Sequence, residues 1–221
     1  MGLRSIAEAA FAMLLVLAAA TGPAAAAGTP GEPMEAGPES IAGRLLVADR
    51  AMSDPRFAES VIFMVRHDET GAFGIIVNRF VIARPLGELF VDMGHEAEGA
   101  EGLMRLHFGG PVEIEIGFVL HTADYEDDSS IAVGGRYALN SGIEVLRRIA
   151  AGAGPRRYLF AFGYAGWGPG QLDNELQRNG WLSVPADDGL IFGGSHDNRW
   201  ERAMAKLGIN ITMLSGDAGH A

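Results

Sequence analysis

The sequence predicts an α+β domain, in which a series of short β-strands is combined with a few amphipathic helices. β-Rich runs at 61–66 and 73–78 flank the turn residues 68–71, which is the pattern of a β-hairpin. Apolar residues at helical spacing indicate helices at 143–150 and 197–207. Of the 221 residues, 48% are hydrophobic, which allows one domain with its own core or at most two small ones.

The other predicted elements follow the same two patterns along the chain. Strands are expected at 41–48, 105–108, 117–122, 131–133, 137–139, 157–162, 190–192 and 210–214, and further helices at 84–90 and from Gln171 onwards. Ser141 and Glu144 form a predicted capping box, because a hydroxyl and a carboxylate can each accept a hydrogen bond from a free N–H group at a helix start. Gly180 is expected to end the helix from Gln171 in the left-handed conformation.

The first residues follow the order of segments found in a secretory signal peptide. Arg4 precedes an apolar run at 11–20, and three alanines end the segment before Gly28. We therefore expect export to the periplasm; if translation instead starts near Met34, the protein is cytoplasmic. No later stretch is long and apolar enough to span a membrane. The predicted division is a signal peptide at 1–27, a disordered lead-in at 28–40, a folded domain at 41–214 and a flexible tail at 215–221.

Charge and cysteine content exclude several classes of protein and site. The formal net charge is −11, and Lys206 is the single lysine among the 17 basic residues. This acidic balance argues against specific DNA binding, which usually requires a clustered basic face. The chain contains no cysteine, so disulfides, thiolate metal sites and cysteine nucleophiles are all excluded.

The least generic part of the chain is the glycine-rich stretch 163–182. A predicted strand leads into it, glycines and Pro169 form a compact turn, and a helix follows from Gln171. Glycines allow backbones to approach closely, and a helix N-terminus offers free N–H groups that can bind an anion or a polar ligand. A second glycine-rich turn, 109–111, also follows a predicted strand.

If the two turns meet at one rim of the sheet, they line a shared groove. The candidate binding residues of this groove are Asn78, Gly109, Gly110, Pro111, Trp167, Gly168 and Gln171. The alternative is that the glycines only permit tight packing. Trp167 has glycines on both sides and is expected to be less enclosed than the other tryptophans. Under either explanation, Gly168→Val is expected to damage folding.

Two other arrangements suggest chemistry, but a structural explanation is preferred for both. His107 and His121 could face each other across neighbouring strands and hold a metal with Glu113 or Glu115, yet their spacing is not that of a tight ligand set. The Ser-His-Asp run at 195–197 has adjacent members, whereas a catalytic triad draws its members from separate segments. We predict no metal site and no cofactor.

Four blocks of the chain resemble the YqgE/AlgH family. They lie at 43–66, 71–79, 107–121 and 163–182, in order over nearly all of the predicted domain. The resemblance implies a single α+β domain with a mixed, barrel-like β-sheet and helices packed outside. It also implies a largely uncharacterised protein, typically cytoplasmic, with a transcriptional-regulator label that comes from a member linked to alginate production.

The chain departs from the family pattern in three places. Phe80 stands where the family usually has proline, Ile116 stands where a basic residue is common, and the signal-like N-terminus is atypical. The last departure conflicts with a DNA-facing role. The biochemical activity is unassigned, and the preferred interpretation is a non-enzymatic binding or regulatory module whose partner is an unknown small molecule or protein. The alternative is an enzyme that acts on a small polar substrate in a glycine-rich cleft.

Overall fold

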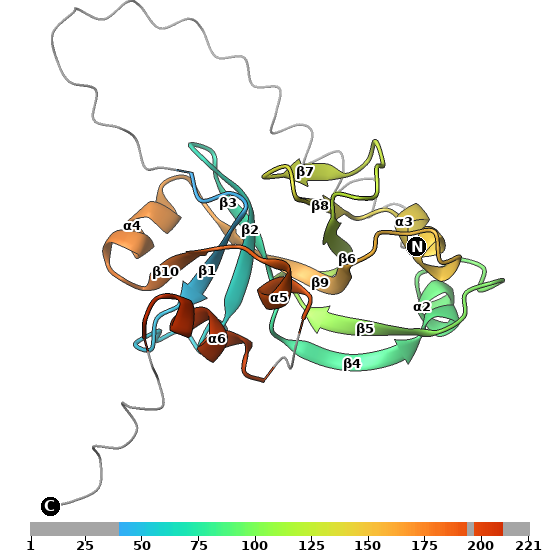
Figure 1. The fold of residues 1–221 in the computed structure, drawn as a ribbon, viewed down its shortest axis with the longest axis horizontal. Helices are drawn as coiled ribbons and strands as arrows, with labels where there is room; N and C mark the ends of the chain where they lie inside the picture. Colours follow the sequence, from blue (N-terminus) through green and yellow to red (C-terminus); the bar gives the residue numbers. More distant parts are fainter. Residues whose placement is uncertain (1–39, 194–196, 210–221) are drawn as a thin grey trace, which may run out of the picture.

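The computed structural model describes residues 40–193 and 197–209, which form ten strands and five helices (Figure 1). The strands are β1 (Arg44–Ala48), β2 (Val61–Asp68), β3 (Gly71–Ile76), β4 (Phe80–Pro85), β5 (Leu103–Phe108), β6 (Val112–Thr122), β7 (Ile131–Val133), β8 (Tyr137–Asn140), β9 (Tyr158–Trp167) and β10 (Trp181–Pro185). The helices are α2 (Leu86–Asp92), α3 (Ile143–Ala150), α4 (Gln171–Gln177), α5 (Asp188–Ile191) and α6 (Arg199–Lys206).

The sheet is organised around β9, which pairs with three other strands. The main path runs β10-β1-β2-β3-β9-β6-β8-β7, and β5 also pairs with β9 while β4 pairs with β5. The β5–β9 pair is parallel, and the other described pairs are antiparallel. Figure 1 shows β1, β2, β3 and β10 on one side of β9, and β4 to β8 on the other. The expected single α+β domain with a mixed, barrel-like sheet and helices outside is confirmed.

The sheet forks where β3 and β9 separate. Their pairing covers Ala72–Gly74 and Ala165–Trp167, and beyond it Gly109 takes the position between the two strands. The Gly109 N–H donates to the Phe162 carbonyl oxygen at 2.7 Å, and its own carbonyl oxygen accepts from the Ile76 N–H at 2.8 Å. Any side chain here would overlap the facing backbone, so glycine is required for this close approach.

Three hydrophobic clusters form the core. One lies between β1, β2, β3, β6, β9 and the two C-terminal helices, the second lies under α4, and the third lies under α2 and α3. α6 is fixed to the sheet by Trp200, whose indole N–H donates to the Ala48 carbonyl oxygen at 2.8 Å. Among the described residues, no helix has the length and apolar character needed to span a membrane.

Several predicted elements differ from the structure. The predicted strand at 190–192 is wrong, because α5 occupies these residues and the Asp187 carboxylate accepts from the Leu190 N–H at 2.9 Å as a helix N-cap. The predicted capping box is also wrong: α3 has Gly142 at its N-cap with no side-chain cap, and Asn140 Oδ1 accepts the Gly142 N–H instead, at 2.7 Å. Glu144 reaches toward arginines on the next turn of α3.

The glycine-rich stretch also folds differently from the expectation. β9 continues to Trp167, so the compact turn is confined to 168–170. The left-handed residue after α4 is Asn179, with φ of 56°, and not Gly180. β4 was not predicted, β6 begins five residues before the expected strand, and the predicted strand at 210–214 lies outside the described residues. Likewise, the predicted segments at 1–27, 28–40 and 215–221 lie outside the described residues, except for Ser40.

Candidate functional site

The candidate groove residues lie at three separate places in the described structure. Trp167 pairs with Ala72 at the start of β3, whereas Asn78 follows the other end of this strand. Its side chain binds the preceding loop: Oδ1 accepts from the Val61 N–H, and Nδ2 donates to the Glu59 carbonyl oxygen, both at 2.8 Å. Gly109, Gly110 and Pro111 lie at the sheet fork, where Gly110 packs directly on the backbone of Tyr164 and Ala165.

Trp167 and Gln171 belong to a group of side chains around Glu175, which we call the Glu175 cluster. Its members are Phe57, Trp167, Gln171, Glu175 and Trp181. Glu175 Oε2 accepts from the indole N–H groups of Trp167 at 3.0 Å and Trp181 at 2.8 Å. Gln171 donates to Glu175 Oε1 at 2.9 Å, and its own Oε1 accepts from the Gly168 N–H at 3.2 Å. The Phe57 ring contacts both indoles.

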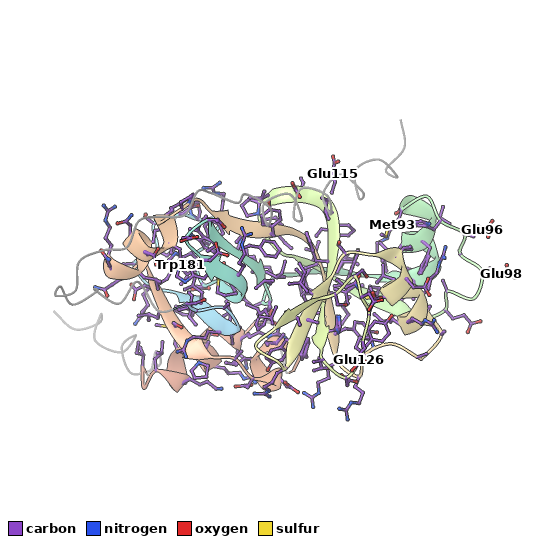
Figure 2. The ribbon with its side chains drawn as sticks, turned by 90° about the horizontal axis from the view of Figure 1, so that it is seen from above. Met93, Glu96, Glu98, Glu115, Glu126 and Trp181 are labelled. Carbon is purple, nitrogen blue, oxygen red and sulfur yellow. The ribbon has the colours of Figure 1, made fainter. Side chains whose placement is uncertain are left out.

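These contacts answer the expectation that Trp167 is less enclosed. Trp167 is 8% exposed, against 6% for Trp200 and 3% for Trp181, so it is the least enclosed of the three by a small margin, yet it is buried in a core cluster. Figure 2 shows the neighbouring Trp181 among packed side chains at one end of the molecule. Glu96 and Glu98 extend outward at the other end. Because its polar groups satisfy one another internally, the cluster has the character of a structural unit.

The two histidines considered as metal ligands are held separately. His107 on β5 and His121 on β6 lie on strands that pair with β9 from opposite sides, so they do not face each other. His107 Nδ1 is 3.0 Å from the Phe160 carbonyl oxygen, and His121 Nδ1 is 2.9 Å from that of Thr122. Within 40–193 and 197–209, no group of three or more His, Asp or Glu side chains could hold a metal ion. Residues 194–196 of the Ser-His-Asp run are not described.

A pocket of about 230 Å³ lies between β5, the first residues of β9, the end of α5 and the start of α6. We call it the Arg199 pocket. It is lined by Leu103, Met104, Arg105, His107, Tyr158, Leu159, Phe160, Ile191, Phe192 and Arg199. Two of these residues are arginines and one is a histidine, whereas none is acidic. This composition is notable in a chain of net charge −11, and it makes the pocket a candidate site for an anion.

Arg199 is the most unusual side chain of this pocket. It is fully buried, at 0% exposure. Its Nη1 donates to the Ile191 carbonyl oxygen at 2.9 Å and to that of Val77, and its Nη2 donates to that of Gly193 at 3.3 Å. Its Nε has no hydrogen-bond partner in the described part of the chain. These contacts hold the side chain in place but supply no negative charge.

The charge of Arg199 is not balanced by a carboxylate of the described residues, since its side chain forms no ion pair there. Burial and the neighbouring charges of Arg202 and Arg105 lower the pKa of Arg199 to about 10. The guanidinium therefore remains protonated at neutral pH. A buried cation without a counter-charge is costly, and an anion bound in the pocket would reduce this cost.

The sequence contained a signal for Arg199 that the groove hypothesis did not use. The last helix has an inward face that includes Trp200, Ala203 and Met204, and all three are buried. Arg199 precedes Ala203 by four residues, so it falls on this same face. A charged residue on the apolar face of a helix is the pattern that could have indicated the site.

Comparison with known proteins assigns the family. The model of the AlgH-like family matches residues 45–212, which is most of the chain. The chain belongs to the AlgH-like family. A UPF0301 protein of Afipia carboxidovorans is 42% identical over 202 residues, covering 88% of this chain and 96% of that protein. A UPF0301 protein of Rhodospirillum rubrum is 44% identical over 181 residues, covering 82% and 94%.

Solved structures agree with the fold of this AlgH-like chain. The solution structure of AlgH from Pseudomonas aeruginosa is 34% identical, has a TM-score of 0.65, and covers 85% of this chain and 99% of that one. A crystal structure from Corynebacterium diphtheriae is 20% identical with a TM-score of 0.56, covers 80% and 88%, and supports the fold alone. The resemblance to the YqgE/AlgH family is thereby confirmed, and the family's function is unassigned.

Proposed function

We propose that this AlgH-like protein is a non-enzymatic binding module that takes a small anionic ligand in the Arg199 pocket. The observation that carries the proposal is Arg199 itself, a fully buried arginine that lines the pocket and has no carboxylate partner in the described chain. Ligand binding would supply the missing negative charge. It would thereby stabilise the C-terminal helices against the sheet, because Arg199 already joins α5, α6 and the end of β3.

Local charge supports an anion over a neutral or cationic ligand. Arg105 is exposed beside the pocket, and Arg202, one turn after Arg199, also donates to the Gly193 carbonyl oxygen at 3.3 Å. The pocket lining thus contains two arginines and no carboxylate although the whole chain is acidic. Arginine is also well suited to hold an anion, because its planar guanidinium can donate two parallel hydrogen bonds.

The lining residues favour binding over catalysis. They include no Ser, Thr, Lys, Asp or Glu that could act as a nucleophile or carboxylate base. Burial raises the pKa of the Tyr158 hydroxyl, so this group is neutral at physiological pH. The one lining side chain suited to general acid–base chemistry is His107, so the enzyme alternative has less support than binding.

The test is a titration of the full chain with inorganic phosphate and with acetate, at constant ionic strength set by chloride. We expect saturable binding by calorimetry and a rise in melting temperature. At a ligand concentration ten times Kd, the added stability is about 1.4 kcal/mol.

The matched variants are Arg105→Gln, at the pocket, and Arg84→Gln, an arginine on β4 that pairs with Glu88 and Asp92. The first should weaken binding about tenfold or more, since it removes a charged partner of the anion, and the second should leave it unchanged. If neither anion binds at tens of millimolar and an organic carboxylate does not bind either, or if both variants have equal effects, the proposal is refuted.

A further inference from the structure

The walls of the Arg199 pocket carry chemical information beyond its charge. Beside the cationic groups, most lining residues are apolar or aromatic, namely Leu103, Met104, Tyr158, Leu159, Phe160, Ile191 and Phe192. Ligand pockets commonly combine such walls with a few polar groups that fix orientation. A fully hydrated inorganic anion would use the cationic groups but leave these walls without a partner.

Some of the apolar side chains at the pocket are exposed to solvent. Leu103 is 68% exposed and Tyr158 is 38% exposed, and both line the pocket. Phe80, 41% exposed on neighbouring β4, has the Arg105 guanidinium 4.9 Å from its ring centroid. Exposed apolar side chains that gather around a polar centre mark a binding surface more often than scattered ones do.

The volume limits the size of the ligand. A cavity of about 150 Å³ holds one benzene molecule, so about 230 Å³ accommodates a single ring or a short hydrocarbon chain together with one carboxylate. Pockets that bury drug-sized ligands span about 300–1,000 Å³. The pocket is therefore too small to enclose a nucleotide.

The remaining donors of Arg199 suit a carboxylate. Three of the five guanidinium N–H groups donate to backbone carbonyl oxygens, two from Nη1 and one from Nη2. The two that remain are the Nε–H and one N–H of Nη2. Nε and Nη2 form the edge of the guanidinium that holds a carboxylate through two parallel hydrogen bonds.

We infer that the ligand is a monocarboxylate whose body is one aromatic ring or a short hydrocarbon chain. The carboxylate pairs with Arg199 and Arg105, and the body packs against Leu103, Tyr158 and Phe192. This inference rests on the proposed anion site, and it adds the chemical class of the ligand.

The experiment compares benzoate, acetate, inorganic phosphate and benzyl alcohol by calorimetric titration of the full chain. We expect benzoate to bind at least tenfold more tightly than acetate, and benzyl alcohol, which lacks the charge, not to bind. If phosphate or acetate binds and benzoate is no tighter, the inference fails while the anion site stands. If none of the three anions binds, the proposed function fails as well.

Two exposed apolar residues, Leu103 at the pocket and Val91 away from it, supply a test variant and its control. Leu103→Ser should weaken benzoate about fivefold and leave acetate unchanged, because it removes apolar contact without touching the charged groups. Leu103 is 68% exposed, so this change does not threaten the core. Val91→Ser, at a position on α2 that is 61% exposed and does not line the pocket, is the control. Equal benzoate affinity in the wild type and the Leu103→Ser variant would overturn the predicted packing of the ligand body.

Discussion

Replacing Glu175 tests whether the glycine-rich stretch is primarily a structural unit. In Glu175→Ala, the indole N–H groups of Trp167 and Trp181 lose their common acceptor. These side chains are 8% and 3% exposed, so water replaces the carboxylate poorly. An unsatisfied buried donor costs about 1–3 kcal/mol, so two of them predict a loss of about 3 kcal/mol after partial relaxation.

The conservative variant and a neighbouring change separate the causes of this loss. Glu175→Gln keeps one carbonyl oxygen as an acceptor and should cost only about 1 kcal/mol. Gln171→Ala removes an exposed side chain and should stay within about 0.5–1 kcal/mol. The assay is urea unfolding followed by tryptophan fluorescence and circular dichroism. A Glu175→Ala variant within 0.5 kcal/mol of the wild type would refute the structural role of the cluster.

Three further predictions concern the rest of the chain. Burial acts to raise the pKa of Asp124, but hydrogen bonds from a neighbouring threonine and from Arg156 outweigh it and lower this pKa to about 2. The stability that this group contributes is present above pH 4 and lost as the pH falls toward 2. Asp124→Asn should therefore lower the free energy of unfolding, measured with urea at pH 7, by about 1–2 kcal/mol and reduce the loss of stability at acid pH. An unchanged loss of stability at acid pH would contradict this. Gly110→Ala should prevent folding at 37 °C, as followed by circular dichroism, because its Cβ would overlap the facing backbone. At Gly168, by contrast, an added Cβ would meet nothing within 4 Å, which corrects the expectation that Gly168→Val damages folding. Gly168→Ala should therefore fold normally. Equal stability of the Gly110→Ala and Gly168→Ala variants would refute the argument. Mass analysis of protein from its own host should find a chain that begins at Gly28, and a cytoplasmic chain beginning near residue 34 would sink the export hypothesis.

The sequence was a reliable guide to the fold where local pattern and tertiary structure agree. The hairpin of β2 and β3 and the helix α3 follow directly from alternation and helical spacing. The run 190–192 was misassigned, because three apolar residues fit a strand or a buried helix equally well. The carboxylate of Asp187 then decides for the helix.

The candidate groove was predicted mainly from two glycine-rich turns. A glycine can either open a binding site or allow two backbones to pack closely, and the sequence does not distinguish these roles. At Gly109 and Gly110 the packing is backbone against backbone, as the overlap of any added Cβ shows. Trp167 lies between glycines, yet Trp181 and Glu175, which follow in the chain, enclose its ring and its N–H group. The Arg199 pocket requires β5, β9 and the last two helices to meet, a convergence that no local pattern encodes.

The most direct measurement of the central claim is the proton–nitrogen correlation signal of the Arg199 Nε–H group, followed as benzoate or phosphate is added to the full chain. The partly exposed arginine Arg84, which pairs with Glu88 and Asp92, is the internal control. We predict that the Arg199 signal shifts saturably with the affinity measured by calorimetry, while the Arg84 signal does not move. An unchanged Arg199 signal, or equal shifts at both arginines, would contradict anion binding in the Arg199 pocket.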